Sequence, residues 1–114
     1  MTNGSGEKYD GGKLLFSLLT RGLASPLKTV AAVLTYGALK YSPGGWRDVP
    51  DAERRYEDAL DRHLNAWKSG ERFDDESGLH HLAHAACNTL FLLWFEMKKD
   101  PARDFSLFND PKGE

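Results

Sequence analysis

The sequence has a single cysteine, Cys87, so no disulfide can form within the chain and a metal cluster built on several thiolates is excluded. Long apolar runs are also missing, and the longest, TLFLLWF at residues 89–95, is far too short to cross a bilayer. The first residues are polar and lack the apolar segment of a signal peptide. We therefore expect a protein of the reducing cytoplasm that makes no contact with a membrane.

Neither sign of charge dominates the sequence. Fifteen Lys and Arg residues oppose seventeen Asp and Glu residues, which gives a net charge of −2 over 114 residues. A protein whose main role is to hold duplex DNA usually carries a large positive excess, so we expect no direct binding of duplex nucleic acid. A local basic pocket for a small anion is still compatible with this balance.

Apolar residues recur every three or four positions in three segments, which predicts an all-α fold. The first helix is expected at residues 25–41, with Ser25 as the N-cap and Pro26 in the first helical position. The second is expected at residues 51–68 and the third at 79–98. The third segment is apolar on nearly every side, which is typical of a central helix. We expect a small bundle of three main helices, completed by oligomerisation.

Polar residues gather where this third helix begins. His81, His84 and Asn88 follow one another at steps of three and four, so they project from one side of the helix. A single histidine is commonly a satisfied core or interface residue, but three polar groups on one stripe cost free energy unless partners satisfy them. Together they indicate the wall of a pocket, where a ligand, a metal ion or another helix supplies those partners.

The acidic segment directly before the helix, DDES at residues 74–77, has two possible roles. A carboxylate or hydroxyl at the N-cap satisfies backbone N–H groups and complements the helix dipole. A helix N-terminus is also a natural phosphate site, and carboxylates can hold Mg²⁺ or Mn²⁺ against substrate phosphates. Capping and ligand binding can coexist in this segment.

Basic and aromatic residues occur together in short segments such as KYDGGK, LKYSPGGWR and DRH. In the glycine-rich loop, the ring of Trp46 could stack on a base while the guanidinium of Arg47 binds a phosphate. A tryptophan in such a loop can equally fill the core. The candidate nucleotide-binding residues are Lys8, Lys13, Lys40, Tyr41, Trp46, Arg47, Arg62, His63 and Asn88.

Several of these segments together resemble a phage family described as dATP/dGTP diphosphohydrolase, N-terminal domain. The matching phrases are KYDGGK, VLTYGALKY, GWR, RYEDALDRHLNAW, GERFDDESGLHHLAHAACN and LFLL, in this order, and they cover roughly residues 7–95. The resemblance implies a small helical protein of the infected bacterial cytoplasm that removes pyrophosphate from dATP or dGTP. Similar all-α pyrophosphohydrolases of the MazG type bind Mg²⁺ through Glu-x-x-Glu and Glu-x-x-Asp pairs and form dimers or larger oligomers.

The sequence departs from the MazG pattern because it contains no Glu-x-x-Glu. The nearest pairs are Asp58-x-x-Asp61 and Glu71-x-x-Asp74, and the second falls in a predicted loop. On the resemblance, the candidate ligands of Mg²⁺ (or Mn²⁺) are Asp61, Glu71 and Asp75, and the candidate catalytic residues are His81, His84 and Glu76.

Three functions stay open at this point. The first is a metal-dependent pyrophosphohydrolase of purine deoxynucleoside triphosphates, and the second is a non-catalytic sponge that sequesters a signalling nucleotide of host defence. The third is a helical structural or adaptor protein. For the first two we expect a flexible N-terminal segment at residues 1–12, a helical nucleotide-binding domain at 13–98 and a C-terminal tail at 99–114.

Overall fold

The computed structural model describes residues 13–103, and the expectations for residues 1–12 and for most of the tail lie outside them. The elements in chain order are α1 (Phe16–Thr20), α2 (Ala24–Lys40), the 3₁₀ helix η2 (Gly45–Asp48), α3 (Ala52–Lys68) and α4 (His81–Lys99). Within this described part, extended backbone is paired only in one isolated bridge, between Phe73 and His80. The prediction of a small all-α bundle is confirmed.

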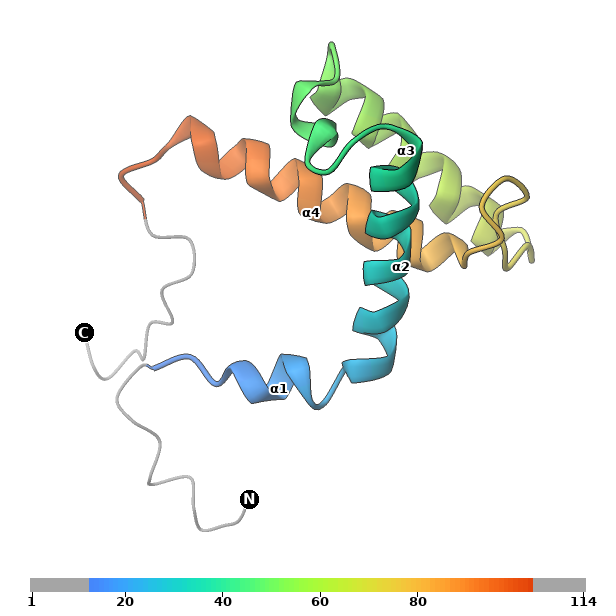
Figure 1. The fold of residues 1–114 in the computed structure, drawn as a ribbon, viewed down its shortest axis with the longest axis horizontal. Helices are drawn as coiled ribbons and strands as arrows, with labels where there is room; N and C mark the ends of the chain where they lie inside the picture. Colours follow the sequence, from blue (N-terminus) through green and yellow to red (C-terminus); the bar gives the residue numbers. More distant parts are fainter. Residues whose placement is uncertain (1–12, 104–114) are drawn as a thin grey trace, which may run out of the picture.

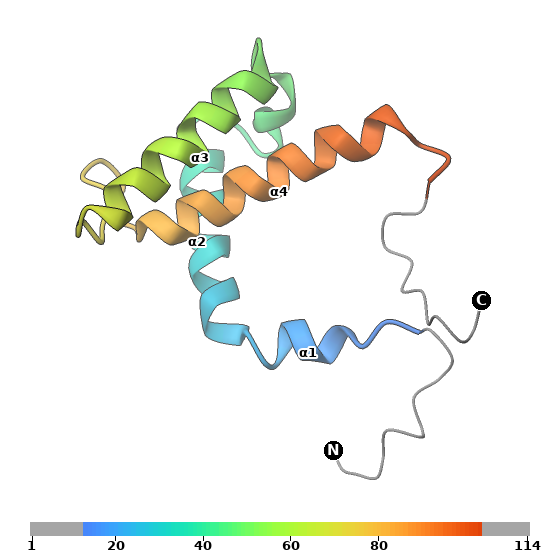
Figure 2. The ribbon, with the colours of Figure 1, turned by 180° about the vertical axis from the view of Figure 1, so that it is seen from behind.

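α4 is the central helix, as its apolar sequence predicts. It lies beside α3 along much of its length, and α2 crosses it on another side (Figures 1 and 2). The buried core joins Val33 of α2 to Ala83 and Cys87 of α4, with Phe91 packed against them. Small residues at this crossing let the helices approach closely: Cys87 is 1% exposed, and its thiol lies 3.5 Å from the carbonyl oxygen of Val30.

The predicted start of the first long helix is wrong. α2 begins at Ala24, with Leu23 as an N-cap that makes no side-chain hydrogen bond, so Ser25 and Pro26 lie within its first turn. The chain passes directly from α1 into α2. The backbone N–H of Leu23 donates to the carbonyl oxygen of Leu19, in α1, at 3.1 Å. Pro26 is tolerated because the first N–H groups of a helix have no partner within it.

α1 lies apart from the α3–α4 pair (Figures 1 and 2). The apolar side chains in and around α1 are largely exposed. The apolar side chains in this region are 44–69% exposed and comprise Leu14, Leu15, Phe16, Leu18, Leu19 and Leu23. An apolar patch of this kind commonly marks an interaction surface, so oligomerisation stays a prediction. Among the described residues, no helix is long and apolar enough to span a membrane.

Candidate functional site

An open groove of about 1270 Å³ lies between the C-terminal half of α2, the 41–50 loop, α3 and α4. Its charged lining consists of four cations, Lys40, Arg47, Arg55 and Arg62, and one carboxylate, Asp48. The chain as a whole has a net charge of −2, so the positive charge is concentrated locally in this groove. A groove of this character attracts an anion.

The loop that closes one end of the groove is held by a glycine turn and by an aromatic cluster. Gly44 has a φ of 73°, which suits glycine, and it caps η2. The hydroxyl of Tyr56 on α3 donates to the carbonyl oxygen of Trp46 at 2.7 Å. These contacts fix the loop against α3.

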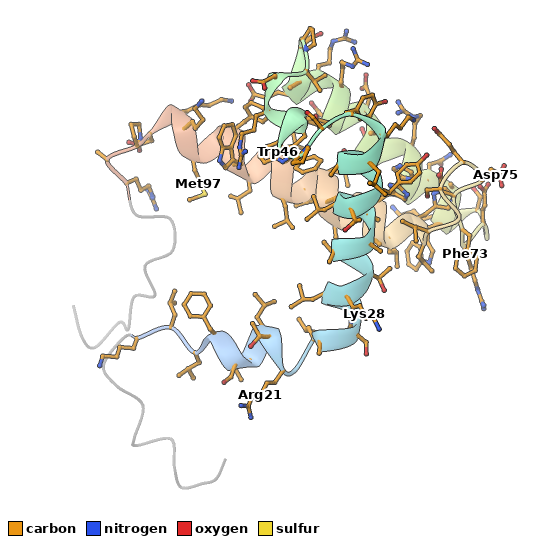
Figure 3. The ribbon with its side chains drawn as sticks, viewed as in Figure 1. Arg21, Lys28, Trp46, Phe73, Asp75 and Met97 are labelled. Carbon is orange, nitrogen blue, oxygen red and sulfur yellow. The ribbon has the colours of Figure 1, made fainter. Side chains whose placement is uncertain are left out.

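Trp46 lies in the aromatic cluster that joins the loop to α4 (Figure 3). Its ring stacks on Phe91, with centroids 4.4 Å apart and planes at 15°, and it meets Trp94 edge-on at 5.0 Å. The Arg47 guanidinium lies 4.8 Å from the Trp46 ring centroid and 5.3 Å from that of Trp94. Trp46 therefore has the core-filling contacts that the sequence left open as an alternative to base stacking.

A histidine cluster lies next to the groove, between α3 and the start of α4. The Nδ1 atoms of His63 and His81 are 2.8 Å apart, and Nε2 of His81 lies 3.0 Å from Oε2 of Glu71. The ring of His84 stacks on that of His63, with centroids 4.5 Å apart and planes at 7°. The buried imidazole of His81 therefore has a partner on each ring nitrogen.

The loop before α4 adds a serine and a carboxylate to this cluster. Oγ of Ser77 lies 2.7 Å from Nε2 of His84, and the Ser77 N–H donates to Oδ2 of Asp74 at 2.8 Å. Oδ2 of Asp74 is also 3.9 Å from the same Nε2. A Ser-His-Asp catalytic triad instead uses both nitrogens of the ring, one for each partner. These residues therefore do not form a nucleophilic triad.

The surroundings favour the neutral imidazoles of His63 and His84 and the ionised carboxylate of Asp74. Burial, aided by the neighbouring His84, lowers the pKa of His63 to about 4, and burial also lowers the pKa of His84. Burial alone would raise the pKa of Asp74, but hydrogen bonds from Ser77 and the nearby imidazoles outweigh it and lower that pKa. Neutral imidazole and ionised carboxylate are the forms that bind metal ions.

The structure brings many of the predicted binding residues to one place. The groove lining includes Lys40, Tyr41, Trp46, Arg47, Arg62, His63, His84 and Asn88. Lys13 is exposed at the start of the described chain and lies outside that lining, and Lys8 lies outside the described residues. Glu76 forms an ion pair with Lys40, and buried Asn88 donates to the carbonyl oxygen of His84 at 2.9 Å.

Arg55, Tyr36 and Tyr56 line the groove, and the sequence-based list omits them. The signal for Arg55 is present in the sequence, since it precedes Ala59 and Arg62 at helical spacing on one face of α3. The signal for the two tyrosines is absent, because their place in the lining depends on how α2 and α3 pack.

The predicted carboxylate ligands do not come together. Asp61 and Asp75 are exposed, and among residues 13–103 one group of His, Cys, Asp or Glu side chains has the spacing of a metal site: His63, Asp74 and His81. Its donor atoms all lie within 4.8 Å of one another. Glu71 reaches this group only through the ring of His81. This group offers two imidazoles and one carboxylate, which differs from the oxygen coordination that Mg²⁺ prefers.

Comparison with known proteins identifies the family. The family model described as dATP/dGTP diphosphohydrolase, N-terminal, matches residues 3–104. A protein of Salmonella phage PMBT28 named dATP/dGTP diphosphohydrolase is 37% identical over 90 residues, which cover 79% of this chain but 29% of that protein. No solved structure matches the chain significantly. The chain belongs to the family of dATP/dGTP diphosphohydrolase N-terminal domains.

Proposed function

We propose that this chain binds the phosphates of a purine deoxynucleoside triphosphate in the groove and acts in its hydrolysis to monophosphate and pyrophosphate. The observation that carries the proposal is the excess of cations over carboxylates in the groove of a chain with negative net charge. The name of the phage relative supports the substrate and the reaction. The chain matches less than a third of that relative, so the activity belongs to the proposal.

The three arginines of the groove suit a polyphosphate. A guanidinium offers parallel N–H donors to two phosphate oxygens, and its charge stabilises the negative charge that grows on the bridging and leaving oxygens. Arg47 lies next to the rings of Trp46 and Trp94, with its guanidinium carbon 4.8 Å and 5.3 Å from their centroids, and these cation–π contacts position its charge at the groove. Lys40 would first have to leave Glu76.

His84 and Tyr41 line the groove, where they can contact the α-phosphate and the base of a bound nucleotide. His84 lines the groove as a neutral imidazole, so it can hydrogen-bond a phosphate oxygen or the water that attacks the α-phosphorus. Attack by that water breaks the bond from the α-phosphorus to the bridging oxygen and releases pyrophosphate. Tyr41 is 75% exposed at the groove and offers its ring to a base.

A matched pair of neighbouring arginines tests the proposal. Arg55 lines the groove, whereas Arg54 forms ion pairs with Asp51 and Asp58. A hydrogen bond between charged groups is worth about 1.5–3 kcal/mol, so Arg55→Ala should weaken dGTP or dATP binding roughly 10- to 100-fold in calorimetry. Arg54→Ala should bind like the wild type. Equal effects of the two substitutions, or no binding by the wild type, contradict the proposal.

The second candidate function is a nucleotide sponge that binds without turnover. It is favoured by the absence, among residues 13–103, of a carboxylate cluster suited to Mg²⁺ bound to a triphosphate. Incubation with each deoxynucleoside triphosphate and with cyclic nucleotides, followed by chromatography of the recovered ligand, separates the two candidates. Release of pyrophosphate supports the hydrolase, whereas tight binding in the presence of a chelator with intact ligand supports the sponge.

A further inference from the structure

The donor atoms of the histidine cluster lie at nearly the distances from one another that a bound metal ion requires. Two zinc ligands at about 2.0–2.1 Å from the ion and at tetrahedral angles are about 3.3 Å apart. The Nδ1 atoms of His63 and His81 are 2.8 Å apart, close to that separation. The Asp74 carboxylate completes a set within 4.8 Å, so a side-chain shift on the order of 1 Å brings all three donors onto one ion.

Glu71 prepares His81 for this role. Its carboxylate lies 3.0 Å from Nε2 of His81, which places the proton on Nε2 and leaves the lone pair of Nδ1 directed at His63. Histidines that bind metals commonly donate their second N–H to a carboxylate in this way. In the structure His63 must then supply the proton between the two Nδ1 atoms. An ion can take the place of that proton when His63 changes tautomer, which moves the His63 proton from Nδ1 to Nε2.

We propose that His63, Asp74 and His81 bind one transition-metal dication of the Zn²⁺ type. Two imidazoles and one carboxylate suit zinc and its neighbours in the first row, whereas Mg²⁺ takes oxygen ligands. Three protein ligands leave a coordination position for water or a further ligand. Because His63 also lines the groove, the site lies at the groove's edge. The proposal concerns metal binding alone and holds whether or not the chain hydrolyses a nucleotide.

The test measures metal binding without nucleotide. Chelator-stripped protein is titrated with Zn²⁺, Co²⁺ and Mg²⁺ in a calorimeter, and bound metal is counted by mass spectrometry after gel filtration. We expect one equivalent of Zn²⁺ or Co²⁺, a rise in melting temperature with either ion, and no comparable effect of Mg²⁺. Bound Co²⁺ should show the visible absorption of a site with nitrogen ligands and low coordination number.

Substitutions identify the ligands. Glu71→Gln should weaken Zn²⁺ binding about 10- to 100-fold, as loss of a carboxylate behind a ligating histidine does, and His63→Gln and Asp74→Asn should weaken it further. His80→Asn is the matched control, because it also removes one histidine while asparagine can replace the cap that His80 provides to the Leu82 N–H. Circular dichroism verifies that each variant folds.

Three results overturn the proposal. They are the absence of stoichiometric Zn²⁺ in the wild type, wild-type affinity in both folded ligand variants His63→Gln and Asp74→Asn, and a Mg²⁺ effect equal to that of Zn²⁺. Since His81 is buried, its replacement could unfold the chain, and for this reason the test rests on the two more accessible ligands.

Discussion

Replacing Trp46 with alanine distinguishes a structural tryptophan from one that stacks on a base. In the structure its ring contacts Phe91, Trp94 and Phe95, and these contacts attach the 41–50 loop to α4. Loss of the ring should therefore destabilise the whole packing of loop, α3 and α4. If the ring instead served mainly as a platform for a base, the fold would tolerate its loss.

The magnitude follows from burial. Truncating a buried Trp or Phe to alanine costs about 3–5 kcal/mol. Trp46 is only partly buried, so we expect the lower end, about 3 kcal/mol. For a domain of this size each kcal/mol lowers the melting temperature by about 4–8 °C, which gives a fall of roughly 12–24 °C. The matched variant Tyr56→Phe removes one hydrogen bond to the Trp46 carbonyl and should cost about 1 kcal/mol.

Urea unfolding followed by far-ultraviolet circular dichroism is the suitable assay, because it reports helix content and not the tryptophan that has been removed. Nucleotide affinity is measured on the same variant under conditions where it is folded. A loss of stability below about 1 kcal/mol would refute the structural role of Trp46. A base platform would instead appear as a loss of binding of about 1–3 kcal/mol with the stability unchanged.

Three further predictions concern the core and the exposed apolar surface. Burial raises the pKa of Cys87 to about 11, so iodoacetamide at pH 8 should label the native protein only as fast as it unfolds, and rapid native labelling in mass spectrometry would contradict this. Because the folded pKa exceeds the unfolded one, the free energy of unfolding should fall as pH rises from about 9 towards 11 in urea titrations. Light scattering should show an oligomer that Leu18→Glu or Phe16→Glu dissociates, and a monodisperse wild-type monomer would count against the predicted assembly.

The helices could be predicted from the sequence because their signals are local. Three- and four-residue periodicity indicates each long helix, and α2 ends at Lys40, one residue before the predicted end at residue 41. The N-cap of α2 could not be assigned in this way. Ser25 has the favoured residue type, but the preceding α1 turn already directs the chain into the helix two residues earlier. Local capping preferences yield when a neighbouring element fixes the backbone first.

The sequence could predict which polar residues share one face of a helix, but not which residues of different helices contact one another. Spacing along α4 places His81, His84 and Asn88 on one face; in the structure His81 contacts His63 of α3, and His84 and Asn88 line the groove. The partner of His81 is His63, eighteen residues earlier, and that pairing depends on the register between α3 and α4. Sequence spacing carries no information about contacts between helices, so it could not indicate that His63, Asp74 and His81 come together, whereas the predicted ligands Asp61 and Asp75 are exposed.

Contacts at two places fix how α3 and α4 are aligned along each other. These contacts explain why the otherwise apolar helix α4 begins with polar residues. At one end Tyr56 packs against Phe91, with ring centroids 4.9 Å apart, and at the other His63 pairs with His81. The aromatic end is stabilised by burial of apolar area, and the polar end by the hydrogen bonds that its imidazoles make. A metal ion bound by His63 of α3 and His81 of α4 would add a further link between the same two helices. If the two ends act independently, Trp46→Ala should lower stability without changing the affinity for Zn²⁺, and a large loss of Zn²⁺ affinity in that variant would show that the register couples them.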